Sequence, residues 1–104
     1  MKEFETTLEI KADSEFFDGH FPSFPLMPAV AQLDLVAHVA GMQFSVPVRI
    51  KKIKRIKFNE KILPGAVVFL KIVQDDTEDD AKKITFEIRS GDKTVLYSSG
   101  TYFV

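Results

Sequence analysis

Residues 28–44 have the sequence PAVAQLDLVAHVAGMQF. Pro28 suits the first turn of a helix, because its fixed φ angle is helical and its missing N–H would have no helical partner there. The spacing predicts a helix from Ala29 to about Phe44, with Gly41 near its end and Pro47 just beyond. Apolar residues occupy nearly all of its sides, which is typical of a helix surrounded by protein. We therefore expect a central helix, not one on the surface.

Strand patterns lie on both sides of this helix. Alternating and β-branched residues predict strands at Phe4–Ile10, Val48–Phe58, Ala66–Gln74, Lys82–Ser90 and Thr94–Val104. Turn residues separate them, and the Gly91-Asp92 step indicates a hairpin. One helix followed by a meander of antiparallel strands predicts an α+β architecture, an antiparallel sheet wrapped around one long central helix. Without an internal repeat or linker, residues 1–104 are expected to form a single domain.

The composition is that of an ordinary globular protein, with 45% hydrophobic and 28% charged residues. A net charge of -1 argues against a protein that coats nucleic acid. There is no cysteine, and the amino terminus lacks the apolar core of a signal peptide, so a cytoplasmic location is expected. The apolar helix is too short and too polar to span a membrane. A chain of 104 residues can bury only a modest core. If it also contained a ligand tunnel, it would gain stability by burying a surface against a second copy of itself, so we expect a homodimer.

A histidine lies in the loop before the helix. The loop is stiffened by prolines, which restrict their own φ angles and the residues before them, so His20 is expected to be held in one place. Histidine titrates near neutrality and is a natural general base. Met27, at the N-cap position, has no oxygen to cap with, so the N–H groups of Ala29 and Val30 lack a local acceptor. A ligand oxygen that develops negative charge would suit them.

A carboxylate lies one turn into the helix. Asp34 and His38 are one turn apart and should share a face, whereas Gln32 should point the other way. Burial favours the protonated carboxyl, which can act as a general acid, and a protonated histidine beside it favours the ionised form. The sequence leaves this balance open. A base, an acid and backbone donors together fit proton removal α to a carbonyl.

These residues belong to a recognisable pattern. The motif Gly-His-Phe-Pro-x-x-Pro-x-Met-Pro at residues 19–28, with Asp34 as the following acid, resembles the active-site signature of the hot-dog-fold 3-hydroxyacyl-[acyl carrier protein] dehydratases. The blocks Ile53–Phe58 and Lys61–Gly65 resemble the strand and Pro-Gly turn that follow the helix in that family. The resemblance implies reversible dehydration of a 3-hydroxyacyl thioester to the trans-2-enoyl thioester, in fatty-acid or polyene-type biosynthesis, without a cofactor. The short chain looks most similar to the aryl polyene pathway dehydratases.

The resemblance also implies roles and partners. His20 would be the base and Asp34 the acid, contributed by different subunits of a homodimer to shared active sites, on an acyl carrier protein or CoA thioester. Ala29 replaces the usual glycine whose N–H polarises the thioester carbonyl, and His38 replaces a glutamine that orients the acid. The acyl tunnel would be lined by Phe21, Leu26, Val30 and Leu33.

Two charged segments admit other interpretations. Cations between residues 49 and 57 protect a sheet edge from pairing, or form a docking patch for an acidic carrier protein, with Lys51, Lys52, Lys54 and Arg55 as candidates. Nucleic acid is not expected, because no aromatic residues interleave them. The acidic run at residues 75–80 lacks the glycine and spaced glutamate of a calcium loop and is expected to be a solvated turn. No metal is expected, since His20, Asp34 and His38 have no recognised ligand spacing.

Two other functions fit the same residues. An acyl thioesterase would use a carboxylate to activate water and would release a free thiol. A non-catalytic module that binds an acyl group or a carrier protein would be favoured if His38 satisfied Asp34 internally.

Overall fold

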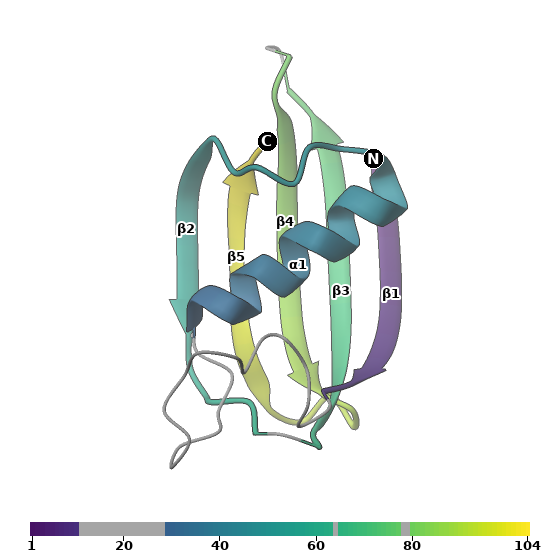
Figure 1. The fold of residues 1–104 in the computed structure, drawn as a ribbon, viewed down its shortest axis with the longest axis vertical. Helices are drawn as coiled ribbons and strands as arrows, with labels where there is room; N and C mark the ends of the chain where they lie inside the picture. The colour runs from purple at the N-terminus through teal and green to yellow at the C-terminus, as the bar shows by residue number, and fades with distance from the viewer. Residues whose placement is uncertain (11–28, 64, 78–79) are drawn as a thin grey trace.

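The structure, a computed structural model, describes residues 1–10, 29–63, 65–77 and 80–104. Helix α1 lies diagonally across one face of a five-stranded sheet with the order β1-β3-β4-β5-β2 (Figure 1). All neighbouring strands are antiparallel. The elements are β1 (Lys2–Glu9), α1 (Ala29–Phe44), β2 (Lys52–Phe58), β3 (Val67–Asp76), β4 (Lys82–Ser90) and β5 (Leu96–Phe103). The predicted α+β architecture is confirmed.

The helix and β4 have the predicted bounds, and β2 shows the largest difference. It begins at Lys52 and not at Val48. The chain leaves α1 near the β1 side of the sheet, and residues 45–51 cross the end of the sheet to reach β2 at the opposite edge (Figure 1). Apolar residues in this crossing segment resemble a strand in the sequence because they also pack inward: Val46 and Ile50 contact the core.

The core lies between α1 and the sheet. Every second residue of β3 and β4 is buried on the helix side: Val68, Leu70, Ile72, Ile84, Phe86 and Ile88. Tyr102 of β5 packs beside Phe86, with the ring centroids 6.3 Å apart. From the helix, Leu35, Val36, Val39 and Phe44 enter the same cluster. The period of two in the strands and of about 3.6 in the helix therefore brings these side chains to one interface.

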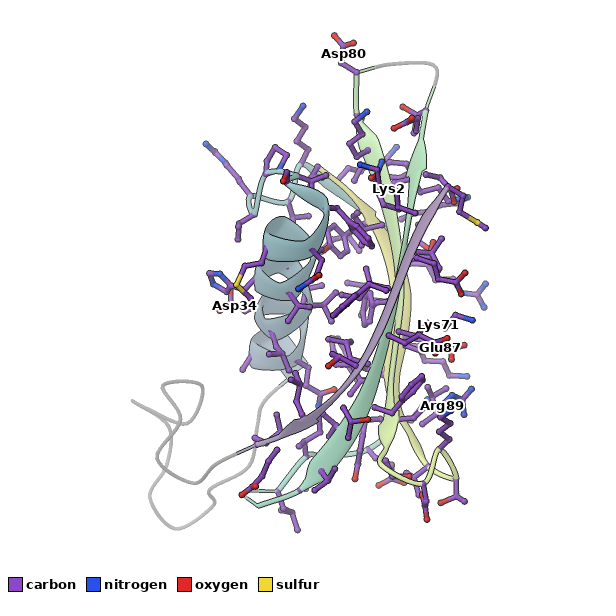
Figure 2. All side chains as sticks on the ribbon, turned by 90° about the vertical axis from the view of Figure 1, so that its right-hand side faces the viewer. Lys2, Asp34, Lys71, Asp80, Glu87 and Arg89 are labelled. Carbon is purple, nitrogen blue, oxygen red and sulfur yellow. The ribbon has the colours of Figure 1, made fainter. Side chains whose placement is uncertain are left out.

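The expectation that α1 is surrounded by protein is wrong for the single chain. The side chains of Asp34 and His38 are each 52% exposed, and Met42 is 73% exposed. Figure 2 shows Asp34 on the side of α1 that faces away from the sheet. The sheet covers one side of the helix, and among residues 31–44 Met42 is the exposed apolar residue on the remainder.

Two local features bring the crossing segment close to the helix. Ser45 follows α1 with a φ of 55°, a left-handed conformation that reverses the chain after a helix. Gly41 has no Cβ, and a Cβ there would lie only 2.9 Å from Cγ2 of Val48. Glycine at this position therefore lets residues 46–48 pack against the last turn of α1.

The predicted hairpin at Gly91-Asp92 joins β4 to β5, and Ser90 N donates to Val95 O at 2.8 Å across it. The acidic run joins β3 to β4. In it, the Asp76 carboxylate accepts hydrogen bonds from Lys82 Nζ at 2.7 Å and from Gln74 Nε2 at 3.0 Å. The Lys82 ammonium lowers the pKa of Asp76. This carboxylate is thus engaged by the hairpin itself. Within the described residues, α1 does not have the length and apolarity needed to cross a membrane.

Candidate active site

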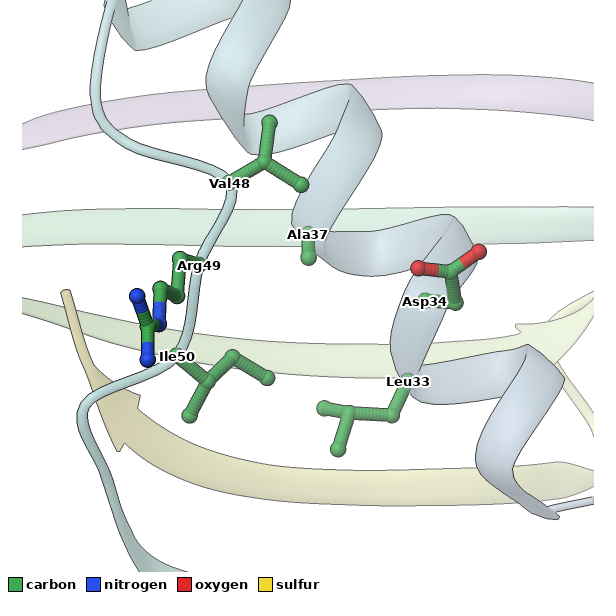
Figure 3. A pocket seen from close by; sticks show the side chains of 6 residues that line it. All are labelled: Leu33, Asp34, Ala37, Val48, Arg49 and Ile50. Carbon is green, nitrogen blue, oxygen red and sulfur yellow. The ribbon is translucent and has the colours of Figure 1, made fainter.

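A groove lies on the outer side of α1, between the helix and the crossing segment. Its volume is about 330 Å³, and we call it the acid groove. Figure 3 shows its two walls. Its lining residues are Leu33, Asp34 and Ala37 from α1 and Val48, Arg49 and Ile50 from the crossing segment. Apolar side chains with one carboxylate and one guanidinium are typical of a site that orients an apolar ligand by a few polar groups.

Asp34 and His38 share one face of α1, as predicted. Nε2 of His38 lies 3.5 Å from Oδ1 of Asp34. Gln32 points the other way: it is 2% exposed, and its Nε2 donates to the carbonyl oxygen of Glu60 at 3.4 Å. The Asp34–His38 distance is longer than that of a strong hydrogen bond, and both side chains are half exposed. The Asp34 carboxylate is therefore open to a ligand and is not enclosed by its neighbour, in contrast to the buried acid expected from the sequence.

The predicted site residues at positions 20–30 fall into two groups. His20, Phe21 and Leu26 lie outside the described residues. Ala29 and Val30 form the start of α1, where backbone N–H groups have no acceptor in the preceding turn of helix. The helix therefore carries candidate carbonyl-binding donors at its start and a carboxylate one turn later.

Arg49 in the acid groove was missed as a site residue. The sequence placed it only in a run of cations, because residues from 48 onward were predicted to be strand. The available signal was Gly41: a glycine inside a helix costs stability and therefore indicates a close approach by another segment. That approach is what brings Val48 and Arg49 next to α1.

The basic strand β2 forms an open edge of the sheet, and its two faces differ. Paired residues on neighbouring antiparallel strands share a face. The apolar side chains pair with inward residues of β5 and so lie on the helix side: Ile53 with Tyr102, Ile56 with Gly100 and Phe58 with Ser98. Three of its cations lie on the outer face with residues of β5: Lys52 with Phe103, Arg55 with Thr101 and Lys57 with Ser99. Ile53 is 51% exposed and Phe58 is 41% exposed.

Metal ligands do not gather in the described part of the chain: no group of three or more histidines or carboxylates there is arranged to hold an ion.

Comparison with protein families matches residues 1–101 to the ApeI-like family, described as ApeI dehydratase. Among curated proteins, the chain is 27% identical over 105 residues to the 3-hydroxyacyl-[acyl-carrier-protein] dehydratase FabZ of Lactobacillus helveticus, covering 94% of this chain and 71% of that protein. It is 35% identical over 71 residues to the bifunctional enzyme LpxC/FabZ of Bacteroides thetaiotaomicron. That match covers 61% of this chain and 15% of the enzyme, so the chain spans only a small part of this relative's length.

Solved structures give the same picture of the fold. An uncharacterised protein from Erwinia carotovora subsp. atroseptica is 31% identical with a TM-score of 0.76, over 98% of this chain and 82% of that one. A chain of the dehydratase heterocomplex ApeI:P from Xenorhabdus doucetiae is 28% identical with a TM-score of 0.71, over 96% and 84%. The fluoroacetyl-CoA-specific thioesterase FlK matches with a TM-score of 0.64 at 14% identity, which concerns the fold alone. These likenesses confirm the hot-dog fold.

Proposed function

Because the chain belongs to the ApeI-like dehydratase family, we propose that it catalyses the reversible dehydration of a 3-hydroxyacyl thioester to the trans-2-enoyl thioester. The substrate is carried by an acyl carrier protein or by CoA, in cytoplasmic fatty-acid or polyene-type biosynthesis. The observation that carries the proposal is the position of Asp34, a half-exposed carboxylate in a largely apolar groove, one turn after the start of α1.

The chemistry needs one proton removed and one delivered. His20 takes the proton from C2, and the electrons form the double bond between C2 and C3 as the C3–O bond breaks. Asp34 protonates the departing hydroxyl, which leaves as water. The Ala29 N–H holds the thioester oxygen while negative charge develops there. Each acid or base contribution of this kind is worth about 10²–10⁴ in rate.

His38 acts as a positioning residue in this proposal. Its imidazole is within 3.5 Å of the Asp34 carboxylate and lies on the same open face of α1. The contact restricts the orientation of Asp34, and it leaves the second carboxylate oxygen available for the substrate. Val30 and Leu33, together with Phe21 and Leu26, which precede them in the sequence, are proposed to line the acyl tunnel.

The test is hydration of a crotonyl thioester by single variants. His20→Ala and Asp34→Asn should each reduce turnover by at least about 10² while circular dichroism and thermal unfolding stay close to those of the parent chain. Asp80→Asn, at the far end of the β3–β4 hairpin (Figure 2), is the matched control and should leave turnover unchanged. Full activity of either site variant would sink the proposal.

The open side of the molecule supports a homodimer. Exposed apolar residues occur in the last turn of α1, in the crossing segment and in the edge strand β2: Met42, Val48, Ile53 and Phe58. No strand of the described residues pairs with the free side of β2, and pairing with a second copy would satisfy the backbone groups of that side. Such a dimer would cover the exposed face of α1.

Size-exclusion chromatography with light scattering tests this assembly. Ile53→Glu, on the helix side of β2, should convert dimers to monomers, because it places a charge in the apolar contact of both copies. Val95→Glu is the matched control, since Val95 is 41% exposed in the β4–β5 turn. If the Ile53→Glu variant stays dimeric, β2 is not part of the interface.

The positive charge of β2 favours an alternative to the homodimer, which is a dimer with a non-identical chain. Self-pairing of β2 brings the cations of two copies together, which costs electrostatic energy that salt screens. A non-identical hot-dog chain with a neutral or acidic edge would avoid this cost, and the Xenorhabdus doucetiae structure is a heterocomplex. If two β2 strands pair despite the repulsion between their cations, the dissociation constant of the homodimer should fall as sodium chloride rises from about 0.05 to 0.5 M. Monomers at every salt concentration would favour the non-identical partner.

The exposed cations at the start of β2 are proposed to dock the carrier protein. Lys51, Lys52, Lys54 and Arg55 are all exposed. Acidic carrier proteins would be steered to this edge, which raises the association rate at low salt. Replacing Lys52 and Arg55 with Gln should raise KM for an acyl carrier protein substrate and not for a small thioester without a carrier.

The two alternative functions remain distinguishable. Thioester hydrolysis would release free thiol from an acyl thioester, whereas dehydration would not. A binding module would retain its ligand affinity without turnover and would tolerate Asp34→Asn. The open Asp34 carboxylate argues against the module, whose premise was an acid satisfied by His38.

A further inference from the structure

Arg49 is the charged residue of the acid groove that the dehydration chemistry does not use. It lines the groove with Asp34 but comes from the opposite wall. Figure 3 shows its guanidinium directed away from the Asp34 carboxylate. None of the ion pairs among the described residues involves Arg49. Among the described residues, the groove therefore holds a cation that has no carboxylate partner and points away from the acid of the same groove.

The backbone around Arg49 is anchored on both sides. Val48 packs against α1 at Gly41, and Ile50 contacts the core cluster. The N–H of Lys51 donates to the carbonyl oxygen of Phe103 at 2.8 Å, which fixes the segment to the end of β5. An exposed side chain on a fixed backbone loses less freedom on binding a ligand than one on a mobile loop.

A guanidinium without a carboxylate partner is suited to a phosphate, which it binds through parallel N–H···O contacts. Resting on the proposed function, we infer that Arg49 binds the phosphate of the phosphopantetheine arm that carries the acyl thioester. The thioester end then points toward Asp34, and the pantetheine portion crosses the apolar wall of Ala37 and Val48. This subsite is separate from Lys52, Arg55 and Lys57, because these cations lie on the outer face of β2.

A substrate should depend on Arg49 only if it has the phosphate. A thioester of 4′-phosphopantetheine has the phosphate, and the same thioester of pantetheine lacks it. Loss of one charge-assisted contact should weaken binding of the phosphorylated compound about 10- to 100-fold and leave the other unchanged. The chemical step is not affected, so the change should appear in KM and not in kcat.

The experiment uses calorimetric binding of 4′-phosphopantetheine and of pantetheine, together with hydration of their crotonyl thioesters. Arg49→Gln should abolish the preference for the phosphorylated compound, and Arg49→Lys should retain part of it. Arg89→Gln is the matched control, because Arg89 lies on the outer face of β4 and pairs with Glu87 at 3.0 Å. The preference should persist in that variant.

The outcomes separate the subsite from the reaction. An Arg49-dependent preference in binding without turnover of either thioester would support the phosphate subsite and contradict the proposed function. The phosphate subsite would be overturned if the parent chain bound both compounds with equal affinity, or if Arg49→Gln lost the same affinity for both. Turnover of the thioesters in either case would leave the proposed function standing.

Discussion

Nε2 of His38 lies 3.5 Å from Oδ1 of Asp34, one turn further along the exposed face of α1. As a solvent-exposed pair, this contact adds little to stability. Its proposed effect is on geometry, because a small misplacement of a catalytic group is costly to the rate. His38→Gln keeps a hydrogen-bond donor at this position, so kcat for crotonyl thioester hydration should stay close to that of the parent chain.

The matched variant His38→Leu keeps the size of the side chain but removes the donor. Its kcat should fall about 10- to 100-fold with KM little changed. Rescue by glutamine and loss with leucine would together identify a positioning residue. Equal activity of both variants would show that the contact has no role, and equal loss would show that the imidazole itself takes part in proton transfer.

Gly100 determines how closely β2 packs on β5. A Cβ at this position would lie 2.5 Å from the carbonyl oxygen of Arg55 and 3.0 Å from Cα of Ile56. Since these are backbone atoms, the strand itself would have to move, and we expect Gly100→Ala to cost about 1–3 kcal/mol of unfolding free energy. Each kcal/mol corresponds to about 4–8 °C in Tm for a domain of this size.

Ser99→Ala is the control for this measurement, because it removes a hydroxyl from the adjacent position without adding a Cβ. Differential scanning calorimetry of both variants should show the large decrease only for Gly100→Ala. A Tm of Gly100→Ala within about 2 °C of the parent would mean that β2 can move to accommodate the Cβ without loss of unfolding free energy, contrary to the geometry.

Local patterns in the sequence predicted most of the fold. The helix at Ala29–Phe44 and the strand at Lys82–Ser90 have the predicted bounds because their periodicity and flanking Pro and Gly residues agree. The crossing segment was mistaken for strand, since Val48 and Ile50 pack on the helix and the core and not in a ladder. Periodicity reports which residues are buried and does not report what covers them.

The candidate site was predictable in part. The spacing of Asp34 and His38 predicted their adjacency, because it depends only on helix geometry. The exposure of this face was not predictable, since an apolar surface has the same sequence pattern whether the same chain or another one covers it. Arg49 was missed for a different reason: its place in the groove depends on the tertiary contact between Gly41 and Val48.

Asp92 should titrate well below an ordinary aspartate. Its carboxylate accepts hydrogen bonds from the hydroxyl groups of Ser90 and Thr94 and from the N–H of Thr94 at 3.1 Å. These bonds lower its pKa to about 2, the Ser90 hydroxyl having the largest effect. Because the pKa is lowered in the folded chain, the stabilisation is complete above the ordinary value of 3.8 and is lost as the pH falls toward 2. Carbon-detected NMR titration should show this, and Ser90→Ala should raise the value toward 3.8; an unshifted Asp92 would contradict the hairpin geometry.

If the active sites are shared between subunits, two inactive variants should regain activity when they form mixed dimers. His20→Ala and Asp34→Asn homodimers should each be inactive. If each site takes His20 from one chain and Asp34 from its mate, a mixed dimer has one site with both changes and one site with neither. Unfolding the two variants together and refolding them should therefore restore turnover, up to about a quarter of the parent value when half of the dimers are mixed and each has one intact site. His20→Ala refolded alone is the control, and failure of the mixture to regain activity, with mixed dimers confirmed by native mass spectrometry, would place both residues of a site in one chain.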